Sequence, residues 1–181
     1  MLRKFFIKNK KNNLACNKSA FTLVEVITVL LVISIGMTGV MSLIVQNIKS
    51  QSINKNTLVA YQLAQEGIEL IRKVRDTNWL TGTGAGKWKK NLSAGNYYMD
   101  YESTIPVSAT TKASGRLSQD DDGMYYSDPI SDLPEGFFSR IINISYPNGS
   151  DKNMLVRSNV YWTDRGKNYS YSLEAELYDW K

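Results

Sequence analysis

Residues 21–45 read FTLVEVITVLLVISIGMTGVMSLIV, and this stretch decides the architecture of the chain. It contains a single charged side chain, Glu25. An α-helix of about 20 apolar residues is long enough to cross a hydrocarbon layer of about 30 Å. Its few hydroxyl groups can bond to carbonyl oxygens of the same helix. The sequence therefore predicts a transmembrane helix over residues 21–45.

The twenty residues before this stretch form a basic leader. They contain no acidic residue and six basic ones, Arg3, Lys4, Lys8, Lys10, Lys11 and Lys18. This bias predicts a cytoplasmic N-terminus and an extracytoplasmic C-terminal part. Because the whole chain carries a net charge of +5, the remainder is close to neutral. A DNA-binding domain usually carries basic residues on its folded part, so nucleic acid is not expected as the primary ligand.

The apolar stretch has two simpler interpretations. A secretory signal has an apolar core of about 7–15 residues and a small-residue cleavage site; this stretch is longer, and residues 35–42 offer no such site. A plain uncleaved anchor fits the length but does not explain Glu25. A carboxylate at the centre of a membrane helix costs about 2.5–3.5 kcal/mol, so Glu25 needs a partner, a function or a position at the membrane interface.

Helical periodicity continues beyond the apolar stretch, to about Arg75. Apolar or small residues recur there at spacings of three and four, which predicts an amphipathic helix: Ala60, Leu63, Ala64, Gly67, Ile68, Ile71 and Val74. Residues 77–86, TNWLTGTGAG, predict the end of the helix and a glycine-rich loop.

The remainder of the chain predicts β-strands at 96–103, 136–146, 153–163 and 169–179. The last three strands alternate apolar and polar residues, which is typical of a sheet with one apolar face. Asp164-Arg165-Gly166-Lys167 predicts a hairpin turn. We therefore expect an α+β protein, with a leader (1–20), a transmembrane half-helix (21–45), an amphipathic half-helix (46–76) and an extracytoplasmic head (77–181).

Catalytic machinery is not evident in the sequence. There is no histidine, and the single cysteine, Cys16, lies in the leader. Zinc sites of Cys and His, Cys–His pairs and Ser-His-Asp triads are thereby excluded. The sequence predicts neither an enzyme nor a cofactor. A weak calcium candidate is Asp120 and Asp122 beside Gly123, although a solvated turn explains these residues as well.

Residues 18–25, KSAFTLVE, resemble the prepilin cleavage and methylation motif of type IV pilins and pseudopilins. The resemblance implies a pilin-like fold and cleavage between Ala20 and Phe21 by a prepilin peptidase. It also implies N-methylation of Phe21 and a role for Glu25 in subunit assembly. Ala20 departs from the family, which prefers glycine there. The implied partners are membrane lipid before assembly, other pilin subunits and an inner-membrane assembly platform.

A second resemblance extends further along the chain, to minor pilins of the type IV pilus modification (PilV-type) group. It rests on residues 63–69, 75–79, 98–101, 122–125 and 138–140 and on Trp180. It implies a minor structural subunit, expected to be that of a type IV pilus, but it does not separate a minor pilin from a type II secretion pseudopilin. The open alternatives are a type II secretion pseudopilin, a filament-tip adhesion module using tyrosines such as Tyr97, Tyr98, Tyr125 and Tyr126, and an anchored hydrolase, which would need converging carboxylates.

Overall fold

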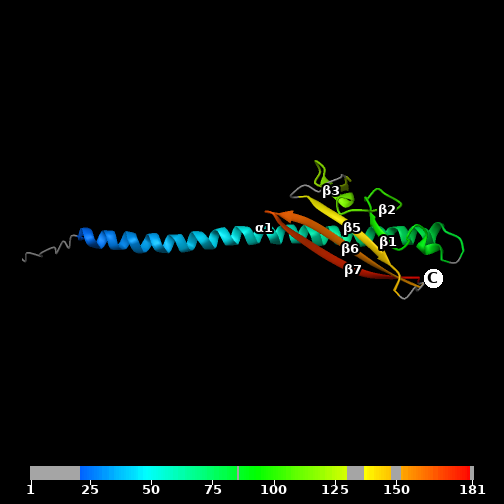
Figure 1. The fold of residues 1–181 in the computed structure, drawn as a ribbon, viewed down its shortest axis with the longest axis horizontal. Helices are drawn as coiled ribbons and strands as arrows, with labels where there is room; N and C mark the ends of the chain where they lie inside the picture. The colour runs from blue at the N-terminus through cyan, green and yellow to red at the C-terminus, as the bar shows by residue number, and fades with distance from the viewer. Residues whose placement is uncertain (1–20, 85, 130–136, 148–151, 180–181) are drawn as a thin grey trace, which may run out of the picture. The chain divides into compact units, whose positions relative to one another are not determined.

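The computed structural model describes residues 21–84, 86–129, 137–147 and 152–179 (Figure 1). The chain divides into two compact units, Met1–Asn47 and Ile48–Lys181. Helix α1 (Leu23–Thr81) contributes to both units. Each unit is described by itself below.

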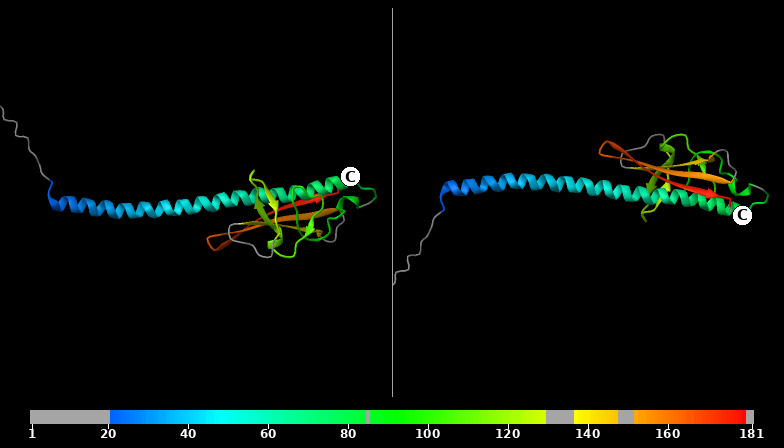
Figure 2. Two further views of the ribbon diagram at one scale, coloured as in Figure 1. Left: turned by 90° about the horizontal axis from the view of Figure 1, so that it is seen from above. Right: turned by 90° about the horizontal axis from the view of Figure 1, so that it is seen from below.

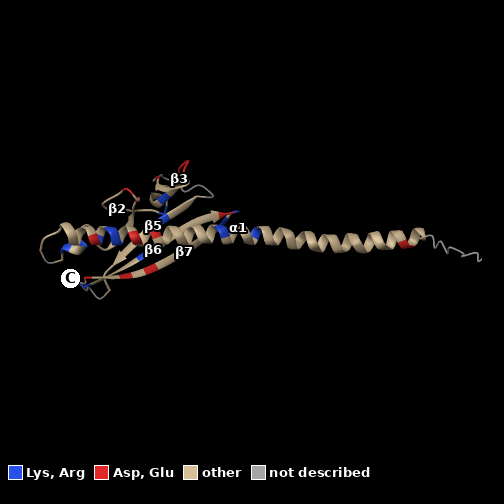
Figure 3. Ribbon diagram, turned by 180° about the vertical axis from the view of Figure 1, so that it is seen from behind, with Lys and Arg blue, Asp and Glu red and all other residues tan. Residues whose placement is uncertain are grey.

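The described part of the first unit is the beginning of α1. All of its side chains are exposed, including large apolar ones such as Leu30 and Ile33. Figure 3 shows this part of the ribbon without charge except for one acidic position near its start, which is Glu25. Within the described residues, α1 is the one helix that is long and apolar enough to cross a membrane.

The end of α1 corrects the predicted loop at 77–86, because the helix continues to Thr81. Asn78 and Trp79 are buried. The amide nitrogen of Asn78 donates to the carbonyl oxygens of Trp88 (3.1 Å) and Lys90 (2.7 Å), in and just after the 3-10 helix η1 (Lys87–Lys89). These tertiary contacts stabilise an extra turn that local sequence signals alone would end earlier.

The described residues of the second unit contain one antiparallel sheet of seven strands. The strands are β1 (Gly95–Tyr98), β2 (Val107–Ser108), β3 (Arg116–Gln119), β4 (Tyr125–Ser127), β5 (Phe138–Ser145), β6 (Asn153–Asp164) and β7 (Lys167–Tyr178). β5 pairs with β6 along one edge, and β7 pairs with β6. Along its other edge β5 pairs with β1 at residues 142–144 and with β3 at 138–139, so the sheet divides there into the ribbons β1–β2 and β3–β4.

The sheet packs on the second half of α1, as the periodicity predicts. Figure 2 shows the strands on one side of this part of the helix. All seven residues of the predicted stripe are buried. Ile71, fully buried, packs with Ile142 and Val156 in one core cluster, and Leu63 packs with Val160 and Trp162 in a second. The predicted pilin-like α+β architecture, a long helix on an antiparallel sheet, is confirmed.

Three predicted strands are found with shifts of at most two residues. The strand predicted at 96–103 is wrong in its second half, because β1 ends at Tyr98 and residues 101–102 form a turn. β2, β3 and β4 were not predicted. The hairpin turn lies at the predicted position, with Asp164 opposite Lys167. Arg165 (φ 52°) and Gly166 (φ 71°) have the two successive positive φ values of a type I′ turn. The unpredicted strands have two to four residues each and lack an alternating apolar pattern.

The expectation of a single apolar sheet face is wrong at β5, which is buried on both sides. On the side facing away from α1, Ser139 donates a hydrogen bond to the carbonyl of Lys112, and the 3-10 helix η2 (Ala113–Gly115) covers the strand. A Cβ at Gly115 would lie 2.2 Å from the carbonyl oxygen of Arg140. Glycine is therefore required for this close approach.

Candidate functional site: the start of α1 and the surface of the head

The start of α1 positions Glu25 through Thr22. The backbone N–H of Glu25 donates to the Thr22 hydroxyl (3.3 Å) and to the Thr22 carbonyl (3.0 Å). Thr22-x-x-Glu25 has the spacing of a capping box, in which the acid also lies in the positive first turn of the helix. Both of these bonds are made by the Glu25 backbone, and the carboxylate interacts locally through its place in the first turn. The sequence analysis missed this local interaction, although the Thr-x-x-Glu spacing could have revealed it.

No side chain within residues 21–47 can neutralise Glu25, because that segment contains no lysine or arginine. A shallow surface pocket beside Glu25 is lined by the apolar residues Phe21, Val26, Val29 and Leu30. Phe21, the predicted new N-terminus, is 78% exposed. Ala20, the other side of the predicted cleavage site, lies outside the described residues.

The hydroxyl side chains of the apolar helix bond to its own backbone. Thr28 donates to the Glu25 carbonyl (2.9 Å), Ser34 to the Leu30 carbonyl (2.7 Å) and Thr38 to the Ile35 carbonyl (2.8 Å). Polar groups satisfied within the segment can enter an apolar medium at low cost. Glu25 is thus the one strongly polar side chain in this part of the helix for which an apolar medium provides no partner.

Arg140 is the principal charged residue inside the head, and the sequence analysis gave it no role. Its side chain is 2% exposed and its Nη1 lies 3.0 Å from Glu66 Oε2. Nη1 also donates to the carbonyl of Leu63 (3.1 Å), and Nη2 donates to the carbonyl of Met99 (3.0 Å). Arg140 therefore connects the central strand, α1 and the chain after β1.

Gly67 allows α1 to approach the sheet next to this cluster. A Cβ at Gly67 would lie 2.4 Å from the hydroxyl oxygen of Ser158 and 3.0 Å from Arg140 Cδ. Gly36 and Gly39, earlier in α1, have no atom within 4 Å of a Cβ built on them. Of these three glycines, only Gly67 is required for steric reasons, because it packs against the sheet.

The acidic turn at Asp120–Gly123 connects β3 and β4. Asp120 Oδ1 accepts hydrogen bonds from the backbone N–H groups of Asp122 (3.1 Å) and Met124 (2.7 Å), and Gly123 has a φ of 83°. No group of three or more acidic, histidine or cysteine side chains able to hold a metal occurs in the described parts of the chain. This geometry accounts for Asp120 as a turn residue and gives no support to the calcium interpretation.

The tyrosines considered for adhesion do not form one exposed patch. Tyr97 packs against the core. Tyr125 packs edge-on against Phe138, with ring centroids 6.0 Å apart, and burial raises the pKa of its hydroxyl above the ordinary 10.0. Tyr98 is half-buried, and Tyr126 is exposed, at 37%. The structure therefore offers no aromatic platform built from these residues.

Comparison with protein families supports the class of protein. Residues 16–41 match the model of the prokaryotic N-terminal methylation motif. The match covers the end of the leader and the beginning of α1, including Phe21 and Glu25. Together with a long helix packed on an antiparallel sheet, it supports a protein of the type IV pilin or pseudopilin type, whose N-terminal helix suits membrane anchoring. Comparisons with curated proteins and with solved structures gave no match.

Proposed function

We propose that this chain is a minor structural subunit of a type IV pilus, with no catalytic role. The observation that carries the proposal is a single carboxylate, Glu25, in the otherwise uncharged residues 21–47 at the beginning of α1, where the methylation motif lies. The leader would be removed between Ala20 and Phe21 by a prepilin peptidase, and the new Phe21 amine would be methylated. The N-terminus would lie in the cytoplasm before cleavage, and the head would be extracytoplasmic.

Assembly would exchange lipid around the first half of α1 for the helices of other pilin subunits, with the help of an inner-membrane platform. Glu25 and the Phe21 amine of a neighbouring subunit would then be desolvated together. Two opposite charges tolerate burial when they are paired and hydrogen-bonded, whereas removing one partner costs about 3–5 kcal/mol. The proposed role of Glu25 is therefore to pair with a neighbour's N-terminus.

Capping and pairing make different predictions for Glu25, and three variants separate them. Glu25→Ala removes both the carboxylate and its first-turn interaction, Glu25→Gln removes only the charge, and Thr22→Ala removes only the cap. If Glu25 pairs with a neighbour, both Glu25 variants lose entry into sheared filaments while Thr22→Ala assembles almost normally. All three should insert into membranes.

The measurement is the amount of each variant in membrane and sheared-filament fractions from a host with the cognate machinery. Normal assembly of Glu25→Gln together with failure of Thr22→Ala would show that helix capping is the role of Glu25.

N-terminal sequencing and intact mass of the native protein test the removal of the leader and the methylation of Phe21. Retention of residues 1–20 would contradict the proposal and favour the plain anchor.

A type II secretion pseudopilin is the second candidate, because the methylation motif is compatible with either system. The filament in which the chain is recovered distinguishes them: a surface pilus supports the minor pilin, and a periplasmic pseudopilus dependent on a secretin-linked secretion system supports the pseudopilin. The PilV-type resemblance does not separate the two, because minor pilins and pseudopilins share the fold and the N-terminus.

A further inference from the structure

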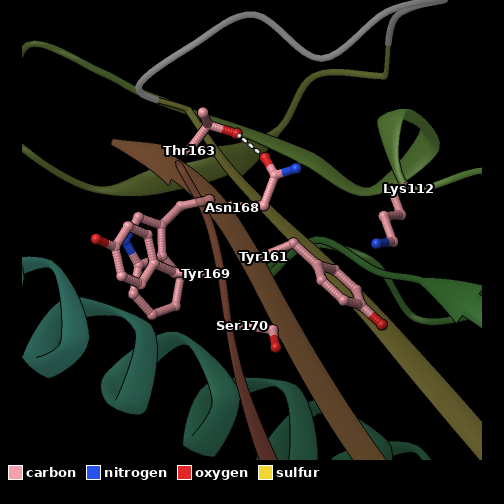
Figure 4. Close-up of a pocket in the computed structure, with 7 residues that line it drawn as sticks. Lys112, Tyr161, Thr163, Asn168, Tyr169 and Ser170 are labelled. Atoms are coloured by element: carbon pink, nitrogen blue, oxygen red, sulfur yellow. Dashed lines mark hydrogen bonds between the residues drawn. The ribbon is translucent and has the colours of Figure 1, made fainter. Parts of the chain in front are cut away.

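A cavity of about 240 Å³ lies beside the β6–β7 hairpin on the head (Figure 4). It is lined by Lys112, Tyr161, Trp162, Thr163, Asn168, Tyr169 and Ser170. Trp162 and Tyr169 stack with ring centroids 5.6 Å apart and belong to the core packed on α1. They provide a rigid support for the polar side chains of the hairpin, which lie on the opposite face of the sheet.

Lys112 gives the cavity its charge. Its Nζ lies 4.1 Å from the centroid of the Tyr161 ring. Among the described residues that line the cavity, Lys112 is the only charged one. A cation–π contact of this kind holds the ammonium group in place but does not neutralise it. No carboxylate is found among the described lining residues, so this part of the cavity favours an anion.

Asn168 supplies a second donor. Its Oδ1 accepts a hydrogen bond from the Thr163 hydroxyl (2.8 Å), which fixes the orientation of the amide. Figure 4 shows the amide nitrogen on the side of Lys112. An ammonium group and an amide N–H directed to the same space match the two oxygens of a carboxylate.

The hairpin also leaves two hydroxyl groups open at this point. On the same sheet face, Arg157 bonds to Glu174 (2.5 Å) and Asn159 to Ser172 (2.8 Å) across the strands. The next pair, Tyr161 opposite Ser170, makes no such side-chain bond within the described structure. Both residues line the cavity, so their hydroxyls can bond to a ligand.

We propose that this cavity binds one carboxylate-bearing sugar residue. Lys112 and Asn168 would hold its carboxylate, and Tyr161 and Ser170 would bond to its hydroxyls. The volume is below the roughly 300–1,000 Å³ of pockets for drug-sized ligands, which fits one sugar residue. An acidic peptide side chain would use Lys112 and Asn168 but leave the two open hydroxyls unmatched.

Saturation-transfer NMR with the full chain, in a detergent without a sugar headgroup, tests this proposal. The probes are glucuronate, glucose and acetate at equal concentration. Glucuronate should receive the strongest saturation. Lys112→Met and the near-isosteric Asn168→Asp should each weaken its binding about tenfold, the effect of losing one charge-assisted hydrogen bond.

Asn96→Asp is the matched control, because Asn96 Oδ1 also accepts a side-chain hydrogen bond, from Asn143 (2.9 Å), away from the cavity. It should leave glucuronate binding unchanged, and circular dichroism should show all variants folded. If glucose received as much saturation as glucuronate, Lys112 would have no role in recognising a carboxylate. If acetate bound as tightly as glucuronate, the sugar ring would contribute nothing, and the ligand would be a peptide carboxylate instead. Absence of glucuronate binding, or unchanged binding in both cavity variants, would overturn the site. None of these outcomes depends on filament assembly.

Discussion

The two halves of α1 differ in where their apolar side chains find partners. Before Asn47 every described side chain is exposed, and the apolar surface surrounds the helix. Between Ala60 and Val74 the apolar stripe lies on one face, and the chain's own sheet covers it. A single helix can therefore stabilise its domain with one half and leave the other half to a medium or partner outside the chain.

Substitution of the same residue type in each half gives the largest expected effect. Ile71→Ala should lower the free energy of unfolding of the head by about 2–5 kcal/mol, because it removes a fully buried side chain. Ile33→Ala, at a position 52% exposed, should leave it within about 0.5 kcal/mol. Urea unfolding followed by tryptophan fluorescence measures both, and similar losses would show that the first half contributes to head stability.

Arg140 gives the next largest effect. Arg140→Met should destabilise the head by about 3 kcal/mol, since it leaves Glu66 and the Met99 carbonyl without their buried partner. Glu66→Gln should cost about 1 kcal/mol, because the Glu66 side chain is 34% exposed and the amide can still accept a hydrogen bond. The same unfolding experiment applies. Equal effects would mean that the charge of Glu66, rather than the three-way contact of Arg140, stabilises the head.

Gly67 and Gly39 allow the two halves of α1 to be compared by the same substitution. Gly67→Ala should destabilise the head by about 1–3 kcal/mol through overpacking against Ser158, despite the better helix propensity of alanine. Gly39→Ala meets no neighbouring atom and should favour the helix by about 1 kcal/mol. Urea unfolding measures the first variant and helicity in micelles the second. A stabilised Gly67→Ala head would show that the sheet can move away from α1.

The smallest effect concerns the end of the β6–β7 hairpin. Hydrogen bonds from Tyr178 and Asn153 lower the pKa of Glu176 from its ordinary 4.5. A lowered folded-state pKa gives stability that is present above pH 4.5 and is lost as the pH falls through the folded value. Tyr178→Phe should therefore reduce the loss of stability between pH 7 and pH 3. Unfolding midpoints of both proteins at the two pH values test this. If the difference between pH 7 and pH 3 were the same in Tyr178→Phe as in the wild type, Tyr178 would not be the cause of the lowered Glu176 pKa.

The fold could be predicted from the sequence where a pattern is repeated over many residues. The stripe Ala60–Val74 and the alternation in β6 and β7 predicted which faces are buried, and Arg165-Gly166 predicted the turn. It was insufficient where distant segments determine the structure. The last turn of α1 depends on Trp88 and Lys90, and the second buried face of β5 depends on η2. Arg140 looked like an ordinary strand residue, because its partners lie 41 and 77 residues away.

The candidate site shows the same division. Phe21 and Glu25 could be predicted as site residues because the residues of the methylation motif are contiguous. The Thr22-x-x-Glu25 spacing is a local signal too, and it could have predicted the helix cap. The cavity beside β6–β7 could not be predicted, because Lys112 approaches Tyr161 from a loop that joins two short strands without a clear pattern. The conformation of that loop depends on the packing of Gly115 against Arg140.

The long separation between Arg140 and α1 has a consequence for the order of folding. Ala60–Trp79 are synthesised well before β5, β6 and β7, which cover them, so the apolar face of the helix has no intramolecular cover during that interval. Contacts this distant in sequence carry a high loop-closure entropy and slow the folding transition. The head should therefore fold cooperatively only after β7 is available, and a factor that shields the helix in the meantime would reduce aggregation of the nascent chain.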